Sequence, residues 1–171
     1  MGKAEENPSY GISEEMLRSL TEVFPLSPVT ASFYGSTEGS ECEYVFQGGN
    51  WLEMSDYPAD NIAQCGFHMP KTTLRYFSPF LLLRLFKGPH NDREDARGVL
   101  RMRAADLQGQ LSREQLKAFT DCLADFLRQE AHHYRKNFSW FLELNCALIQ
   151  AWFSEEISDF IDGISRPEWD R

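Results

Sequence analysis

The sequence lacks long apolar runs. Its 171 residues contain no stretch of about 18 apolar residues, which is the length that a membrane-spanning helix needs. The densest apolar segment, residues 77–86, is interrupted by Ser78, Pro79 and Arg84. The opening segment, residues 1–8, also lacks the apolar centre of a secretory signal. We therefore expect neither a spanning helix nor a cleaved leader, and no membrane partner.

Cysteine is scarce, and the four cysteines of the chain lie far apart. They are Cys42, Cys65, Cys122 and Cys146. Cysteines at such wide spacing are typical of small buried apolar side chains rather than of a disulfide framework. The pattern predicts free thiols and a reducing, cytoplasmic compartment.

The common signatures of catalytic and cofactor sites are also missing. The chain contains no G-x-G-x-x-G, P-loop, G-x-S-x-G, C-x-x-C or H-E-x-x-H motif. The Gly48-Gly49 pair is too short to cradle a phosphate and predicts a plain turn. We therefore expect a protein that is not an enzyme, with no catalytic residues and no cofactor.

Glu130 and His133 form the best candidate for a metal site. Their spacing places both on one helix face, as in the E-x-x-H pairs of di-iron carboxylate bundles. Such bundles need a second E-x-x-H pair, which the chain lacks, and His132 points about 100° away from His133. We interpret the pair as solvated residues near a helix end and predict no metal site.

The composition is that of one globular domain, with 42% hydrophobic and 25% charged residues. We expect a flexible N-terminal tail over residues 1–11, a single helical domain over residues 12–163 and a polar C-terminal tail over residues 164–171. Arg93, Arg97 and Arg101 recur every four residues within the domain. Their spacing favours a solvated basic helix face, with an anion or partner contact as the alternative.

Apolar residues recur at helical spacing through most of the domain. Ser13 is a good N-cap for the first helix, and Ser112 with Gln115 has the pattern of a capping box before a longer one. Residues 70–87 are apolar on more than one face, which predicts a central element. Pro79 lies within them and predicts a kink or two abutting helices.

Residues 29–47 differ from the rest of the domain. Val29, Ala31 and Phe33 alternate with polar residues, and glycine and serine then predict a turn. A small extended or hairpin segment fits this pattern, and an irregular loop is the alternative. The sequence as a whole predicts a mainly α, single-domain helical bundle with a small extended or hairpin segment near residues 29–47.

Three motifs occur in order along roughly residues 13–130. They are F-Q-G-G-N-W at residues 46–51, L-R-Y-F-S-P-F-L-L at residues 74–82 and L-S-R-E-Q at residues 111–115. Together they resemble a family of small bacterial proteins of unknown function, whose members carry G-K-x-W, Y-Y-L-P-A-Y-L and L-T-P-E-Q elements in this order. The chain departs from the family pattern at Gly49-Asn50 before the tryptophan, and at Ser78 and Phe80. The resemblance implies a bacterial, helical, one-domain protein and supplies no active site.

The net charge of −9 is concentrated near the N-terminus, since residues 1–66 hold eleven acidic and two basic residues. Binding of nucleic acid needs a basic footprint, so we expect no nucleic-acid partner. A basic protein partner fits the charge better.

Acidic and aromatic residues interleave over residues 38–60, within the least regular part of the chain. Such a segment can plug a basic cleft, because tight interfaces use aromatic anchors and complementary charge. The alternative is a solvated loop with its rings folded inward. The residues that we predict to bind a partner are Glu38, Glu41, Glu43, Tyr44, Trp51, Glu53, Asp56 and Asp60.

These features favour a non-enzymatic cytosolic binding protein. Its small size and acidity are similar to those of immunity proteins that neutralise bacterial toxins, which is an analogy of scale and charge. We therefore predict an immunity-type inhibitor whose acidic surface binds a protein partner such as a basic toxin domain. A helical adaptor or regulatory protein is the second interpretation, and an enzyme with scattered site residues is the third.

Overall fold

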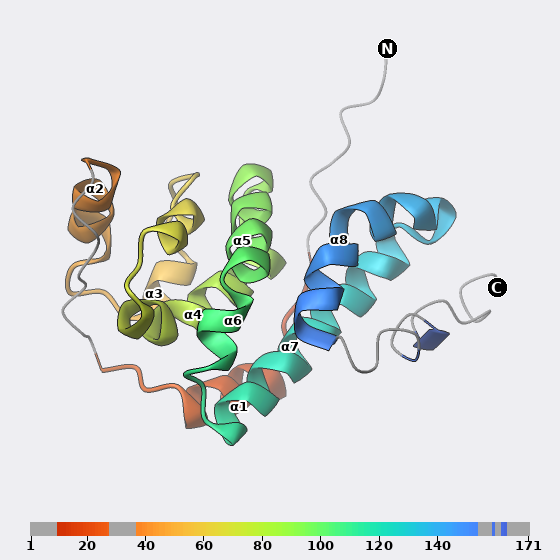
Figure 1. The fold of residues 1–171 in the computed structure, drawn as a ribbon, viewed down its shortest axis with the longest axis horizontal. Helices are drawn as coiled ribbons and strands as arrows, with labels where there is room; N and C mark the ends of the chain where they lie inside the picture. The colour runs from red at the N-terminus through yellow and green to blue at the C-terminus, as the bar shows by residue number, and fades with distance from the viewer. Residues whose placement is uncertain (1–9, 28–36, 154–158, 160–161, 164–171) are drawn as a thin grey trace, which may run out of the picture.

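The computed structural model describes residues 10–27, 37–153, 159 and 162–163, and this part of the chain contains helices and no strand (Figure 1). Its elements are α1 (Glu14–Val23), α2 (Thr37–Phe46), α3 (Trp51–Ser55), the 3-10 turn η1 (Ala63–Phe67), α4 (Lys71–Lys87), α5 (His90–Met102), α6 (Ala104–Gln108), α7 (Arg113–His133), the 3-10 turn η2 (Arg135–Asn137) and α8 (Phe138–Phe153). They form one helical bundle, with α2 at one end and α8 at the other. The predicted mainly α class is confirmed.

Helix α4 lies at the centre of the bundle because it is apolar on every side. Of its 17 residues, 13 are buried. Pro79 lies inside α4 and has no N–H to donate to the carbonyl of Arg75 one turn earlier. The Ser78 hydroxyl donates to that carbonyl instead, at 2.9 Å. Helix α4 therefore continues through the proline as one helix and is not divided into two.

The predicted capping residues begin their helices. The Ser13 side chain accepts a backbone N–H of the first turn of α1 at 3.1 Å. Ser112 and Gln115 form the expected capping box on α7, with both hydrogen bonds at 3.1 Å. The Gln115 amide also accepts from Arg75 at 3.1 Å and donates to the Val23 carbonyl at 3.0 Å. One capping residue thus joins α7 to both α1 and α4.

Arg84 of α4 is buried and anchors the loop between α3 and η1. Its guanidinium donates at 2.9–3.1 Å to three backbone carbonyls of this region, those of Ser55, Tyr57 and Ala59. Its charge is matched by Asp92 of α5, which is fully buried and also accepts the Ala63 N–H at 2.6 Å. A buried charge needs such a partner. The pair therefore fixes the loop against α4 and α5.

Residues 37–46 form helix α2, so the extended or hairpin segment predicted near residues 29–47 is wrong over this range. Residues 29–36 lie outside the described part of the chain. Helix α2 buries Cys42 and Phe46, and the Phe46 ring meets the edges of Phe77 and Phe80 at centroid distances of 4.9 and 5.2 Å. The apolar face of α2 is narrow, which explains why its helical period is weak in the sequence.

A disulfide joins Cys42 of α2 to Cys65 of η1, with the two Cα atoms 5.6 Å apart. This separation is normal for a disulfide. The prediction of free thiols is therefore wrong for this pair, whereas Cys122 and Cys146 are free. Disulfides persist mainly in oxidising compartments. The bond consequently gives no support to the predicted cytoplasmic location.

Two residues of the predicted N-terminal tail contact the bundle. Tyr10 is buried and donates its N–H to the Phe86 carbonyl at 3.3 Å. Gly11 exchanges two hydrogen bonds with the Gln129 side chain, at 3.0 and 2.7 Å. The rest of that tail and the predicted C-terminal tail, residues 164–171, lie outside the described residues.

Among the helices that the structure describes, none combines the length and the apolar character that crossing a membrane requires.

Candidate functional site

A buried ion pair lies beneath the C-terminal half of α7. Glu130 of α7 accepts from Arg97 of α5 through both carboxylate oxygens, at 2.8 and 3.0 Å. Asn145 of α8 donates to Glu130 at 2.7 Å and accepts from Arg97. Burial acts to lower the pKa of the Arg97 guanidinium, but the Glu130 and Glu94 carboxylates outweigh it and leave that pKa raised. Arg97 is therefore charged, and the network joins three helices.

Tyr10, which precedes α1, adds a fourth side chain to this network. Its hydroxyl donates to Glu130 at 3.4 Å, and its ring lies 5.0 Å from the Arg93 guanidinium carbon. Burial, followed by the negative charge of Glu130, raises the pKa of the Tyr10 hydroxyl above its ordinary value. Tyr10 is therefore a neutral hydrogen-bond donor at any physiological pH.

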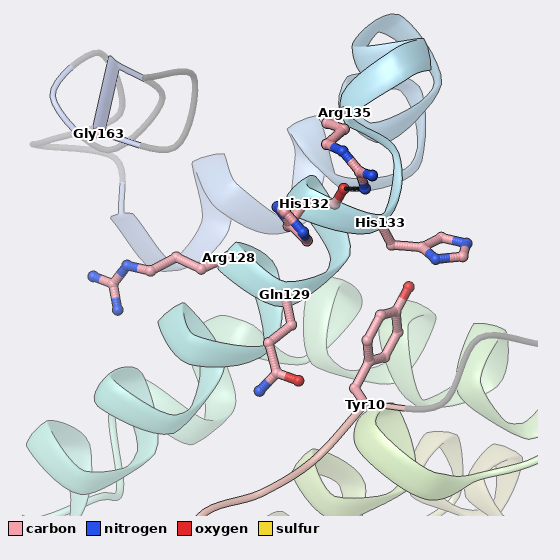
Figure 2. Close-up of a pocket in the computed structure, with 7 residues that line it drawn as sticks. All are labelled: Tyr10, Arg128, Gln129, His132, His133, Arg135 and Gly163. Atoms are coloured by element: carbon pink, nitrogen blue, oxygen red, sulfur yellow. Dashed lines mark hydrogen bonds between the residues drawn. The ribbon is translucent and has the colours of Figure 1, made fainter. Parts of the chain in front are cut away.

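A cavity of about 550 Å³ opens next to the network, where α7 ends and η2 begins (Figure 2). Figure 2 shows the Tyr10 hydroxyl pointing toward His133, and Arg128 extending on the other side of α7. The volume lies in the range of small-molecule pockets. The lining residues are Tyr10, Arg128, Gln129, His132, His133, Arg135 and Gly163.

Arginine and histidine predominate in the described lining of this cavity. Of the seven described residues that line it, four are arginine or histidine and none is a carboxylate. Within residues 128–136 the one acidic residue is Glu130, which is 1% exposed and paired with Arg97. Arg128, Arg135 and Lys136 are exposed. At the end of α7 the acidic side chain is therefore buried and the basic side chains are exposed to solvent.

Glu130 and His133 face different surroundings. Glu130 lies in the buried network, so its interpretation as a solvated residue is wrong, while His133 is exposed and lines the cavity. Their E-x-x-H spacing does not bring them together as a ligand pair. Among the described residues there is no group of three or more side chains that could hold a metal ion.

The residues predicted to bind a partner differ in their exposure and in their contacts within the protein. Glu41 and Tyr44 lie three residues apart on α2, and Tyr44 is 86% exposed. Glu43 on the same helix is half-buried, and Glu53 on α3 is exposed. The side chain of Glu38 lies outside what the structure describes.

Trp51, Asp56 and Asp60 are held by other contacts. Trp51 is fully buried and donates its indole N–H to the Pro25 carbonyl at 3.1 Å, so its prediction as a partner-binding residue is wrong. Exposed Asp56 pairs with Lys87 at 2.7 Å. Asp60 is exposed and accepts from the Asn61 N–H at 2.9 Å and from the Asn91 side chain at 3.3 Å. The most accessible part of the predicted surface is therefore centred on Tyr44.

Two features of the structure were not predicted from the sequence. Arg93 and Arg97 are buried rather than solvated, because their partners come from other parts of the chain. Arg128, His132 and Arg135 are spaced by four and three residues, which is the spacing of one helix face, although Arg135 lies in η2, just after α7 ends. This second pattern is legible in the sequence and could have indicated the cavity at the end of α7.

Comparison of the chain with protein-family models, with curated proteins and with solved structures finds no match. The resemblance to small bacterial proteins of unknown function therefore stays a prediction. Function is therefore inferred from the site residues alone.

Proposed function

We propose that the protein is a non-enzymatic binding protein, an immunity-type inhibitor that neutralises a bacterial toxin through its acidic surface. The supporting observation is Tyr44, which is 86% exposed on α2. Tyrosine is enriched among the residues that dominate binding energy at protein interfaces. An exposed tyrosine beside Glu41 is therefore a suitable anchor for a basic partner.

The charge around Tyr44 supports the same proposal. Residues 19–70 contain no lysine or arginine, and seven of them are acidic. Helix α2 and the segment that follows it thus lie within a long part of the chain that has only negative charge. A field of one sign speeds association with a partner of opposite charge and disfavours acidic competitors. A basic toxin domain fits this requirement.

The two alternatives receive different support. Trp140 on α8 is 44% exposed, and this apolar side chain favours the adaptor interpretation. The enzyme interpretation would be favoured by a pocket that holds His132 or His133 beside carboxylates. Among the described residues that line the cavity of these histidines there is no carboxylate, so these residues give the enzyme interpretation no support of that kind.

Affinity capture from the native host's lysate, read by mass spectrometry, tests the proposal with two matched variants. The first variant is Tyr44→Ala with Glu41→Lys on α2, and the second is Trp140→Ala with Glu143→Lys on α8. We expect the wild type and the α8 variant to recover one basic protein, and the α2 variant to lose it. Loss of a central aromatic anchor weakens binding by roughly thirtyfold.

The salt dependence of capture and the behaviour of the α8 variant show which results would contradict the inhibitor proposal. Capture of the basic partner should decline as salt rises, because salt screens exposed charges. If the α8 variant loses the partner and the α2 variant retains it, the adaptor interpretation replaces the inhibitor. Equal capture by all three proteins would exclude Tyr44 as an anchor.

Cytoplasmic location is part of this proposal and is tested separately. The Cys42–Cys65 disulfide is unusual for a reducing compartment. Fractionation of host cells after rapid thiol blocking measures both the location and the redox state of the two cysteines. Recovery outside the cytoplasm would contradict the cytoplasmic part of the proposal.

A further inference from the structure

The cavity at the end of α7 has a charge opposite to that of the protein as a whole. The chain has a net charge of −9, yet Arg128, His132, His133 and Arg135 gather around one opening. An acidic protein disfavours anions at most of its surface. This cavity nevertheless gathers two arginines and two histidines, and no carboxylate is among the described residues that line it, so its local charge differs from that of the protein as a whole.

Helix capping accounts for Arg135 and does not account for Arg128. A helix C-terminus attracts cations, and Arg135 donates to the His132 carbonyl at 3.0 Å, which satisfies a carbonyl of the last turn. Arg128 lies more than one turn before the end of α7. The Arg128 side chain makes no hydrogen bond or ion pair with another described residue. The five N–H donors of its guanidinium therefore have no partner within the described structure.

Two side chains of α7 and one of η2 define the shape of the site. Arg128, His132 and Arg135 follow one another at intervals of four and three residues and line the same cavity. Figure 2 shows His132 between the two arginines, on the side of α7 that faces the segment of Gly163. Arginine forks and imidazole N–H groups match the oxygens of a phosphate group.

The cavity has more room than a bare phosphate ion needs. Its volume of about 550 Å³ and the partly apolar wall made by the Tyr10 ring leave space for an organic group. The Tyr10 hydroxyl donates to Glu130, so its hydrogen is already engaged within the protein. The lining thus combines an anion-binding side and an aromatic side.

From this geometry we infer that the cavity at the end of α7 is a binding site for a small molecule that carries a phosphate group. Arg128, His132 and Arg135 bind the phosphate, and Tyr10 packs against the rest of the ligand. The site is independent of the acidic surface around Tyr44, so its test does not depend on the proposed inhibitor function.

Titration of the ¹⁵N-labelled full chain with inorganic phosphate and with pyrophosphate, at moderate salt, tests the site. We expect saturable shifts of the backbone amides of Arg128, His132 and Arg135, with tighter binding of pyrophosphate because of its greater charge. Arg128→Gln should weaken binding about tenfold, as expected for the loss of one charged hydrogen bond. The matched control is Arg113→Gln, an exposed arginine at the other end of the same helix.

Three results would overturn the inference. They are the absence of saturable shifts with both probes, shifts that lie away from the end of α7, and equal weakening by Arg128→Gln and Arg113→Gln. The wild-type shift map does not depend on any variant being folded. Since Arg128 and Arg113 are both exposed, circular dichroism should show unchanged helicity in the two variants.

Discussion

Arg97 and Glu130 face each other across the interior in a two-armed ion pair, with oxygen–nitrogen distances of 2.8 and 3.0 Å. Their side chains are 7% and 2% exposed. Removing one partner from such a pair leaves an uncompensated charge in the interior. We therefore expect Glu130→Ala to lower the free energy of unfolding by about 3–5 kcal/mol, measured by urea denaturation.

Asp121 provides the control for that measurement. It forms an exposed ion pair with Lys117 at 2.7 Å on the same helix, where water screens the attraction. Asp121→Ala should lower the free energy of unfolding by roughly 0.5 kcal/mol or less. Similar losses in the two variants would show that burial of the Arg97–Glu130 pair has no energetic effect.

The four cysteines should react in three steps. Cys146 is exposed and free, so iodoacetamide should modify it in the native protein. Burial raises the pKa of the Cys122 thiol to about 12, so Cys122 should react only after unfolding. Cys42 and Cys65 should react only after reduction. Peptide mapping by mass spectrometry measures the order, and labelling of Cys42 without a reductant would contradict the disulfide.

Gly66 allows close contact between η1 and α5. A Cβ atom at this position would lie 2.7 Å from a methyl carbon of Val99 and 3.4 Å from one of Leu81. Gly66→Ala should therefore lower the free energy of unfolding by about 1–3 kcal/mol, seen as a lower Tm. Gly11→Ala is the matched control, since nothing lies within 4 Å of a Cβ there. Equal Tm values would show that η1 shifts freely away from α5.

Asp95 should make the stability depend on pH. Burial, followed by the charges of Asp92, Asp60 and Glu94, raises the pKa of the Asp95 carboxyl above its ordinary value. The folded protein therefore binds the proton more tightly than the unfolded chain, and ionisation of Asp95 costs stability as pH rises. Asp95→Asn should raise the Tm at pH 7.

The Tm change caused by Asp95→Asn at low pH is the control for the change at pH 7. Below the ordinary carboxyl pKa of about 4, Asp95 is protonated in both the folded and the unfolded chain, so the substitution should change the Tm little there. A gain in Tm that is equal at about pH 3 and at neutral pH would mean that the charge of Asp95 is not its cause.

Local features were predictable from the sequence. The caps at Ser13 and at Ser112 with Gln115 depend on hydrogen bonds that reach three residues, so their patterns are visible in the chain. The central place of α4 followed from apolar residues on all of its faces. Of the predicted kink or two abutting helices at Pro79, the division into two helices does not occur, and the sequence pattern did not account for the Ser78 hydroxyl as a substitute donor.

Features that depend on distant contacts were not predictable in the same way. Arg97 looked solvated because its partner Glu130 lies 33 residues away, and the Cys42–Cys65 bond spans 23 residues. Trp51 was expected to bind a partner, and its burial against Pro25 depends on how α3 meets the end of α1. For Tyr44, the sequence indicated an aromatic residue among acids, and the structure adds its exposure.

The disulfide also lowers the amount of apolar surface that α2 needs in order to pack against the bundle. The disulfide restricts the chain between α2 and η1, so docking of this helix costs less conformational entropy than it would without the bond. A helix held in this way needs only a narrow apolar stripe. The remaining positions of α2, including Glu41 and Tyr44, can then vary without loss of the helix from the bundle.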